Sequence, residues 1–222
     1  MEEIPILGVV VGKGQVKMEQ EKIKAVKKWK TPTKIKDIES FLGFTNFYRR
    51  FIHNFSHTAR PLNELKSKKE WKWEKKHQEA FNELKEKITS QPVLSLPRRK
   101  GKFRVEMDAS GHTIGGVLSQ EQDGKWKPIA FLSRTMQATE QNYKIYDKEL
   151  LAIVEALAKW RQYLLDAVEL FEVWTDHENL KYFREPYKLN GQQARWSLKL
   201  QDYDFTIKHI PGKMNTKVDI LS

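Results

Sequence analysis

The sequence predicts a chain in two parts: an α/β fold with a mixed sheet over residues 102–222, preceded by a small, mainly helical subdomain. Residues 19–90 carry apolar side chains at the spacings of three and four that are typical of amphipathic helices. From residue 102 onward, short strand-like runs surround one long helical pattern. Two prolines and a basic cluster separate the patterns and indicate a domain boundary near residues 93–101.

Residues 1–18 are expected to be the remnant of a sheet. Within Ile6–Met18, β-branched residues stand on both sides of Gly12-Lys13-Gly14, a pattern typical of two short strands and a tight turn. An isolated hairpin of this size is only marginally stable in water. The segment therefore packs on the residues after it or was cut from a larger sheet, and the sequence looks truncated at its start.

Three helical segments are predicted over residues 19–92. The first is basic, and its apolar residues recur every three positions. The second follows an N-cap at Thr33 and carries an aromatic stripe. That stripe consists of Phe41, Phe44, Tyr48, Phe51, Ile52 and Phe55. The third follows Trp73 and ends before Pro92, because proline cannot continue a helix. Residues 93–101 are then expected to form an extended linker.

The second part, residues 102–222, is expected to contain three strands, a long helix, a strand, mixed helices, and a last strand and helix. The long helix spans about residues 140–165 and buries a stripe that includes Leu150, Ile153 and Leu157. The predicted strands are residues 102–107, 114–119, 126–132, 168–175 and 203–210.

The charge of the chain points toward a polyanionic partner. The formal net charge is +11, of which residues 1–97 carry +8 and residues 98–222 carry +3. A basic surface favours nucleic-acid binding, but lysines also solvate helix faces, so charge alone leaves both interpretations open. Lys27, Lys28, Arg49 and Arg50 are the candidates for contact with a phosphate backbone.

Several classes of protein are excluded by residues that the sequence lacks. Without cysteine there is no disulfide framework, no thiolate zinc site and no cysteine nucleophile. The six histidines show no zinc-like spacing. No apolar run is long enough to cross a membrane and no leader pattern opens the chain, so an intracellular location, in a cytoplasmic particle or the nucleus, is expected.

Three carboxylates stand where a metal site could form. Asp108 and Asp176 each end a predicted strand, and Glu149 lies at the margin of the buried stripe of the long helix. Taken singly, each has an ordinary explanation as a turn residue or a solvated side chain. Together they can converge on one point, where their mutual repulsion would call for a hard divalent cation such as Mg²⁺. Asp219, at the expected start of a terminal helix, is a fourth candidate.

The second half resembles the ribonuclease H domain of gypsy-type LTR retrotransposon polymerases. Four groups of residues carry the resemblance: Met107-Asp108-Ala109-Ser110-Gly111, Tyr146-Asp147-Lys148-Glu149-Leu150, Trp174-Thr175-Asp176-His177, and Pro211-Gly212-Lys213 followed by Asn215 and Asp219. The first half resembles the reverse-transcriptase thumb of the same family. Its matching motifs are Phe41-Leu42-Gly43-Phe44, Asn46 to Ile52, Pro61-Leu62, Trp73, Ala80-Phe81 and Pro92-Val93-Leu94.

This resemblance implies a ribonuclease H-like mixed sheet whose metal ligands are Asp108, Glu149, Asp176 and Asp219. Two Mg²⁺ ions, for which Mn²⁺ can substitute, would support hydrolysis of the RNA strand of an RNA/DNA hybrid. Residues 1–18 resemble the last palm hairpin of the polymerase. Fingers, most of the palm and the polymerase aspartate pair are absent, so the partners implied are the hybrid and the missing part of the polymerase.

Two histidines and the end of the chain complete the implied site. His209 precedes Asp219 by ten residues, as an assisting histidine does in cellular ribonucleases H. It is a candidate for product release or proton transfer, or it simply ends the final strand. His177 is a weaker candidate. Only three residues come after Asp219, too few to complete a helical turn, so this ligand is expected to be poorly fixed.

Alternative functions are compatible with the same residues. The chain could be a hybrid-binding module with a weak or inert carboxylate site, either as a fragment or as a gene co-opted from a retroelement. A DDE-type integrase would share the core fold, but the Tyr146–Leu150 motif argues against that assignment. Cleavage of a hybrid distinguishes the enzyme from the binding module.

Overall fold

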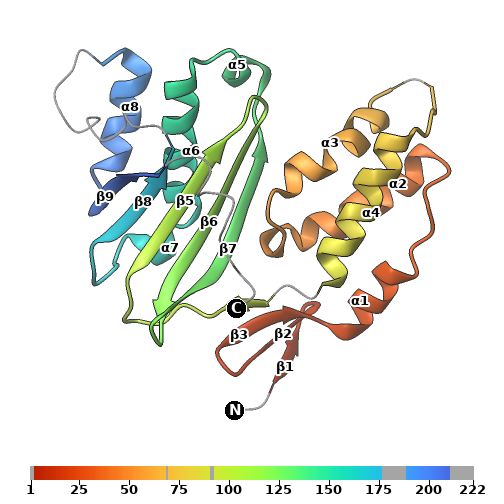
Figure 1. The fold of residues 1–222 in the computed structure, drawn as a ribbon, viewed down its shortest axis with the longest axis horizontal. Coiled ribbons are helices and arrows are strands. Elements are labelled where there is room, and N and C mark those ends of the chain that lie inside the picture. The colour runs from red at the N-terminus through yellow and green to blue at the C-terminus, as the bar shows by residue number, and fades with distance from the viewer. Residues whose placement is uncertain (1–2, 69, 91–92, 177–188, 211–222) are drawn as a thin grey trace. The chain divides into compact units, whose positions relative to one another are not determined.

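The computed structural model describes residues 3–68, 70–90, 93–176 and 189–210. The chain forms two compact units, residues 1–96 and 97–222, and each is described by itself (Figure 1). Within the described ranges, no helix is both long and apolar enough to cross a membrane.

A four-stranded antiparallel sheet opens the first unit. Its strands are β1 (Ile4–Ile6), β2 (Val9–Gly12), β3 (Gln15–Met18) and β4 (Val93–Ser95), in that order. The predicted hairpin is confirmed as β2 and β3, and its turn places Lys13 and Gly14 at positive φ angles of 52° and 73°. The prediction that residues 93–101 are all linker is wrong at its start. Burial of Leu94, which is 3% exposed, favours a strand beside β3.

The helices of the first unit are α1 (Gln20–Lys27), α2 (Ile35–Phe47), a 3-10 turn η1 (Arg49–Phe51), α3 (Phe55–Lys66) and α4 (Lys75–Thr89). The predicted second helix is wrong in two respects. It ends at Phe47, because the backbone leaves helical geometry at Tyr48, where φ is −95° and ψ is 8°, and Asn54, at a left-handed φ of 54°, precedes the separate helix α3. Thr33 is not its N-cap either: the Thr33 amide and hydroxyl both donate to the Asp37 carboxylate, each at 3.0 Å.

Aromatic side chains hold these helices together. The Phe41 ring centroid lies 5.5 Å from that of Trp29 and 4.6 Å from that of Phe81, so the segment that follows α1 packs with α2 and α4 in one aromatic cluster. At the start of α4, Nδ1 of His77 accepts a hydrogen bond from the Glu74 amide at 2.9 Å, and the Glu74 side chain accepts one from the His77 amide, which together form a capping box. The aromatic stripe predicted from the sequence is therefore mostly core, and Phe44 is its one partly buried member.

The second unit contains a five-stranded mixed sheet, as predicted. Its strands are β5 (Phe103–Ala109), β6 (Thr113–Gln122), β7 (Lys125–Thr135), β8 (Phe171–Thr175) and β9 (Phe205–His209), in the spatial order β7-β6-β5-β8-β9. β5, β6 and β7 pair antiparallel, whereas β5, β8 and β9 run parallel. The carboxyl ends of β5, β8 and β9 therefore meet at one edge of the sheet.

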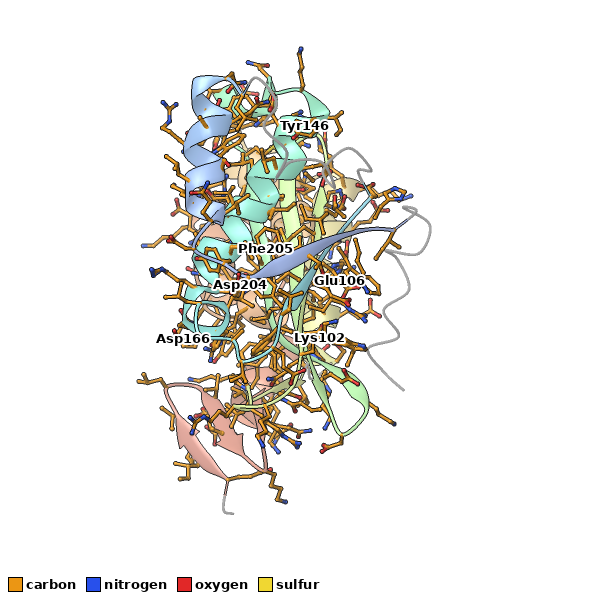
Figure 2. The ribbon with its side chains drawn as sticks, turned by 90° about the vertical axis from the view of Figure 1, so that its left-hand side faces the viewer. Lys102, Glu106, Tyr146, Asp166, Asp204 and Phe205 are labelled. Carbon is orange, nitrogen blue, oxygen red and sulfur yellow. The ribbon has the colours of Figure 1, made fainter. Side chains whose placement is uncertain are left out.

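The helices of this unit are α5 (Ala138–Gln141), α6 (Ile145–Lys159), α7 (Arg161–Leu164) and α8 (Gly191–Leu200). α6 and α8 lie against one face of the sheet, and Figure 2 shows Glu106 on the opposite face. The predicted stripe of Leu150, Ile153 and Leu157 is buried in this core. A single helix over residues 140–165 is wrong, because the backbone turns at Trp160, where φ is −103° and ψ is 18°.

The face of the sheet away from α6 carries a stacked and ion-paired group. The Arg104 guanidinium lies 3.8 Å from the Trp126 ring centroid and 3.6 Å from that of Trp174. Glu172 accepts from the ammonium groups of Lys102 and Lys208, each at 2.6 Å. Burial of Glu172 opposes ionisation, but these hydrogen bonds and one from the Trp174 indole lower its pKa to about 2. These side chains connect β7, β5, β8 and β9.

Gly116 offers a test of this packing, because it pairs with Met107 between β6 and β5. A Cβ at Gly116 would lie 2.3 Å from the Met107 sulfur and 3.0 Å from the Glu106 carbonyl oxygen. Gly116→Ala should therefore lower the free energy of unfolding by about 1–3 kcal/mol through overpacking. Urea denaturation measures this change. Gly111→Ala, where a Cβ would meet nothing within 4 Å, is the control and should change stability by less than about 0.5 kcal/mol.

Candidate active site

Asp108 lies near the carboxyl end of β5, on the face opposite the buried core. The strand alternates, with Val105 and Met107 buried against α6 and Asp108 exposed. Its partner on β6 is Gly115, which has no side chain to cover the carboxylate. The sequence prediction of a strand-terminal, polar position for Asp108 is confirmed by this geometry.

Asp176 directly follows β8, and parallel pairing brings it beside Asp108. The register pairs Arg104 with Glu172 and Glu106 with Trp174. Two residues further along each strand are Asp108 and Asp176, on the same face and at the same edge of the sheet. Both carboxylates are exposed.

Glu149 reaches the same edge from the second turn of α6. It is 2% exposed, far more buried than an ordinary surface glutamate. The backbone of Ala109 hydrogen-bonds to its carboxylate. The Thr175 hydroxyl donates to Glu149 Oε2 at 3.5 Å, a long and weak hydrogen bond. Glu149 therefore contacts the ends of both strands that carry the aspartates.

The three carboxylates influence one another electrostatically. Burial, followed by the negative charges of Asp176 and Asp108, raises the pKa of Glu149 to about 8. Although Asp108 is exposed, partial desolvation by the surrounding protein, followed by the charge of Asp176, also raises its pKa. The charges of the two aspartates thus disfavour ionisation of Glu149, and the charge of Asp176 disfavours ionisation of Asp108. A cation between them would relieve this repulsion.

The donor set suits a hard divalent cation, since it consists entirely of carboxylate oxygens. In the part of the chain that the structure describes, no three histidine, aspartate or glutamate side chains are arranged so that they could hold a metal ion as they stand. The charges of Asp108, Glu149 and Asp176 thus interact, but their side chains would have to move to bind one ion together. The predicted fourth ligand, Asp219, and the candidate His177 lie outside the described residues.

His209 is the last residue of β9, as one of the two interpretations of the sequence expected. Its Nε2 atom lies 2.9 Å from the backbone carbonyl oxygen of Asp176. The ring therefore contacts the main chain of the aspartate rather than its carboxylate.

The candidate nucleic-acid contacts of the first unit differ in availability. Lys27, Lys28 and Arg50 are exposed. Arg49 instead donates to Asn46 at 3.2 Å and to Ser56 at 3.3 Å, and its guanidinium lies over the Phe55 ring. The Arg49 guanidinium is therefore held by contacts within the first unit.

Sequence reasoning missed two groups that surround Glu149. Thr175 is fully buried at the end of β8, and the Ala109 backbone lies at the end of β5. Thr175 stands between Trp174 and Asp176, on the face opposite the two aspartates, and this parity was the available signal that it faces α6. No pattern in the sequence indicates a backbone contact from Ala109.

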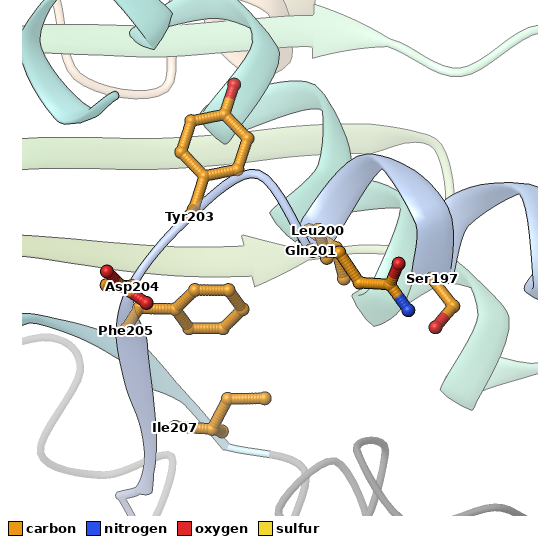
Figure 3. A pocket seen from close by; sticks show the side chains of 7 residues that line it. All are labelled: Ser197, Leu200, Gln201, Tyr203, Asp204, Phe205 and Ile207. Atoms are coloured by element: carbon orange, nitrogen blue, oxygen red, sulfur yellow. The ribbon is translucent and has the colours of Figure 1, made fainter. Parts of the chain in front are cut away.

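A pocket of about 320 Å³ lies elsewhere on the second unit, between the end of α8 and the start of β9 (Figure 3). Asp204 and Phe205, at the amino-terminal end of β9, help to line it. Asp108, Asp176 and His209 lie at the carboxyl ends of their parallel strands. The pocket is therefore at the opposite end of the sheet from the carboxylates.

The fold of the chain is similar to that of foamy viral protease-reverse transcriptases. A foamy viral protease-reverse transcriptase in complex with double-stranded DNA aligns with a TM-score of 0.76 and 24% identity, over 96% of this chain and 45% of that one. The same kind of protein in complex with an RNA/DNA hybrid aligns with a TM-score of 0.73 and 24% identity, over 98% and 30%.

Sequence comparison identifies the family. Residues 98–203 match the RNase H-like domain found in reverse transcriptase. The Tf2-3 and Tf2-4 transposon polyproteins of Schizosaccharomyces pombe are each 40% identical to the chain over 207 residues, which is 91% of the chain and 16% of each polyprotein. The chain belongs to the gypsy-type LTR retrotransposon polyproteins, and it spans about a sixth of the length of these relatives.

Glu149→Gln should stabilise the metal-free protein, by an amount that grows as pH rises. The pKa of Glu149 is raised from 4.5 to about 8 in the folded chain, so between these values the folded state holds a proton that the unfolded state releases. The stability of the parent therefore falls across this window, and glutamine abolishes that loss. We expect almost no difference at pH 4 and a gain on the order of 4 kcal/mol at pH 8.

Urea denaturation in the presence of a chelator at several pH values measures this difference. Asp166→Asn, at an exposed carboxylate of the same unit, is the matched control and should change stability by under about 0.5 kcal/mol throughout. If Glu149→Gln destabilised the protein equally at every pH, burial and the neighbouring aspartates would not be opposing the ionisation of Glu149, and this account would be wrong.

Proposed function

We propose that the second unit hydrolyses the RNA strand of RNA/DNA hybrids with divalent metal ions held by Asp108, Glu149 and Asp176. The observation that carries this proposal is the meeting of the three carboxylates at one edge of the sheet, with the pKa of Glu149 raised to about 8. Membership of the retrotransposon family and the ribonuclease H-like match support the same reaction.

Each carboxylate has a distinct part in this proposal. Asp108 and Asp176 are exposed, so their oxygens can reach an ion that also contacts a substrate phosphate. Glu149 is buried and anchored to both strand ends, so it would hold the ion from the protein side. Asp219 remains a candidate fourth ligand. When bound, the metal would lower the pKa of an attacking water and stabilise charge on the leaving 3′ oxygen.

No protein nucleophile is needed for this chemistry. The substrate is identified by its class: a duplex with one strand bearing 2′-hydroxyl groups, presented in a wide and shallow groove. The chain spans only 16% of the length of the related polyproteins, so this substrate is proposed for the second unit alone.

Asp108→Asn and Glu149→Gln should each reduce cleavage of a labelled RNA/DNA hybrid by at least about 100-fold in Mg²⁺. Mn²⁺ should also support cleavage by the parent, and a chelator should abolish it. Asp166→Asn is the charge-matched control and should cleave like the parent. Equal cleavage by parent and site variants would disprove the site, while binding of hybrid without cleavage by the parent would favour the inert binding module.

We further propose that Lys27, Lys28 and Arg50 of the first unit contact the phosphate backbone, whereas Arg49 is structural. The +8 charge of residues 1–97 and the exposure of these three side chains support the assignment. The hydrogen bonds of Arg49 to Asn46 and Ser56 argue against the same role for Arg49.

The triple variant Lys27→Gln, Lys28→Gln and Arg50→Gln should bind hybrid more weakly at low salt. The slope of log affinity against log salt concentration should become shallower by roughly one for each phosphate that the variant no longer neutralises. Fluorescence anisotropy over a salt series measures both quantities. Lys75→Gln, an exposed lysine at the start of α4, is the control. An unchanged slope in the triple variant would rule out these contacts.

A further inference from the structure

His209 lies beside the end of β8. It pairs with Thr175 in the parallel register of β8 and β9, and the amide of Ile210 donates to the Thr175 carbonyl at 2.9 Å. Asp176 is one residue beyond the last residue of β8. The 2.9 Å contact between the His209 Nε2 atom and the Asp176 carbonyl oxygen therefore extends the connection of β9 to β8 by one residue.

The chemistry of this contact fixes the role of the ring nitrogen. A carbonyl oxygen can only accept a hydrogen bond, so Nε2 must carry the proton. This holds for the neutral tautomer with hydrogen on Nε2 and for the imidazolium cation alike. The hydrogen bond is thus compatible with both charge states, and Nε2 is not available to accept a proton from a reacting group while the bond exists.

We propose that His209 is a positioning residue that fixes the direction in which the Asp176 carboxylate leaves the end of β8. Its contact is with the main chain of the aspartate, whose φ and ψ angles set where the carboxylate points. A proton-transfer role, expected as one possibility from the sequence, would have to use Nδ1, because Nε2 is occupied by this hydrogen bond. The inference rests on the proposed function, because orientation of Asp176 affects catalysis only if Asp176 holds a metal ion.

Two substitutions separate the positioning role from proton transfer. In His209→Gln the side-chain amide can place a donor near the position of Nε2 but cannot exchange a proton near neutral pH. In His209→Leu the side chain fills similar space without a donor. His57→Leu, at an exposed histidine of α3, is the matched control.

Positioning predicts that His209→Gln cleaves hybrid at close to the parent rate, with the same pH profile between pH 6 and 9. His209→Leu should need roughly fivefold more Mg²⁺ for half-maximal rate, the size expected for loss of one neutral hydrogen bond. Loss of activity in His209→Gln together with loss of one limb of the pH profile would overturn the inference in favour of proton transfer.

Metal binding and ring spectra give readouts that do not depend on cleavage. Calorimetry should show Mn²⁺ binding to His209→Leu roughly fivefold weaker than to the parent or His209→Gln. Nitrogen-resolved NMR of the His209 ring should show the proton on Nε2.

If the parent fails to cleave while these differences appear, the proposed function fails and the positioning role stands. Equal Mn²⁺ affinity in all three proteins, or a ring proton on Nδ1 alone, overturns the positioning role whatever the cleavage result.

Discussion

The parallel pairing of β5 with β8 is the constraint on which the candidate site depends. Asp108 and Asp176 are 68 residues apart in the sequence, yet they become neighbours once Arg104 pairs with Glu172 and Glu106 with Trp174. A slip of one residue would turn one carboxylate toward the core. The stack of Arg104 between two tryptophans, and the ion pairs of Glu172 with Lys102 and Lys208, hold this register on the face away from α6.

The same arrangement costs stability. Glu149 is buried beside two aspartates, so in the absence of a cation its ionisation is opposed by both burial and repulsion. Surrounding groups compensate only in part, through the Ala109 backbone and a long hydrogen bond from Thr175. By contrast, Glu172 lies on the face of the sheet away from α6, beside two lysines, and ionises readily, with its pKa lowered to about 2. The second unit thus carries one buried acid with cationic partners, Glu172, and one without, Glu149, and Glu149 with its two exposed aspartates is the functional candidate.

Patterns of period two and 3.6 predict much of this fold, because burial imposes them directly. The alternation in β5 and the stripe on α6 led to Asp108 and Glu149, and both elements are present, although α6 is shorter than the helix predicted over residues 140–165. Boundaries that depend on single backbone angles were not predictable: the backbone at Tyr48 ends one helix, and the backbone at Trp160 ends another. Pairing of Val93–Ser95 with β3 is a long-range choice that no local pattern encodes. For the same reason, the contacts of Glu149 with Ala109 and of His209 with Asp176 appear only in three dimensions.

The central claim is that Asp108, Glu149 and Asp176 form one electrostatic unit at the edge of the sheet. Carbon-detected NMR titration of the Glu149 carboxylate in metal-free protein tests it most directly. We predict a pKa near 8 for Glu149 in the parent, and a lower pKa when both Asp108 and Asp176 are replaced with asparagine. A pKa near the ordinary value of 4.5 in the parent, or no change in the double variant, would contradict the claim.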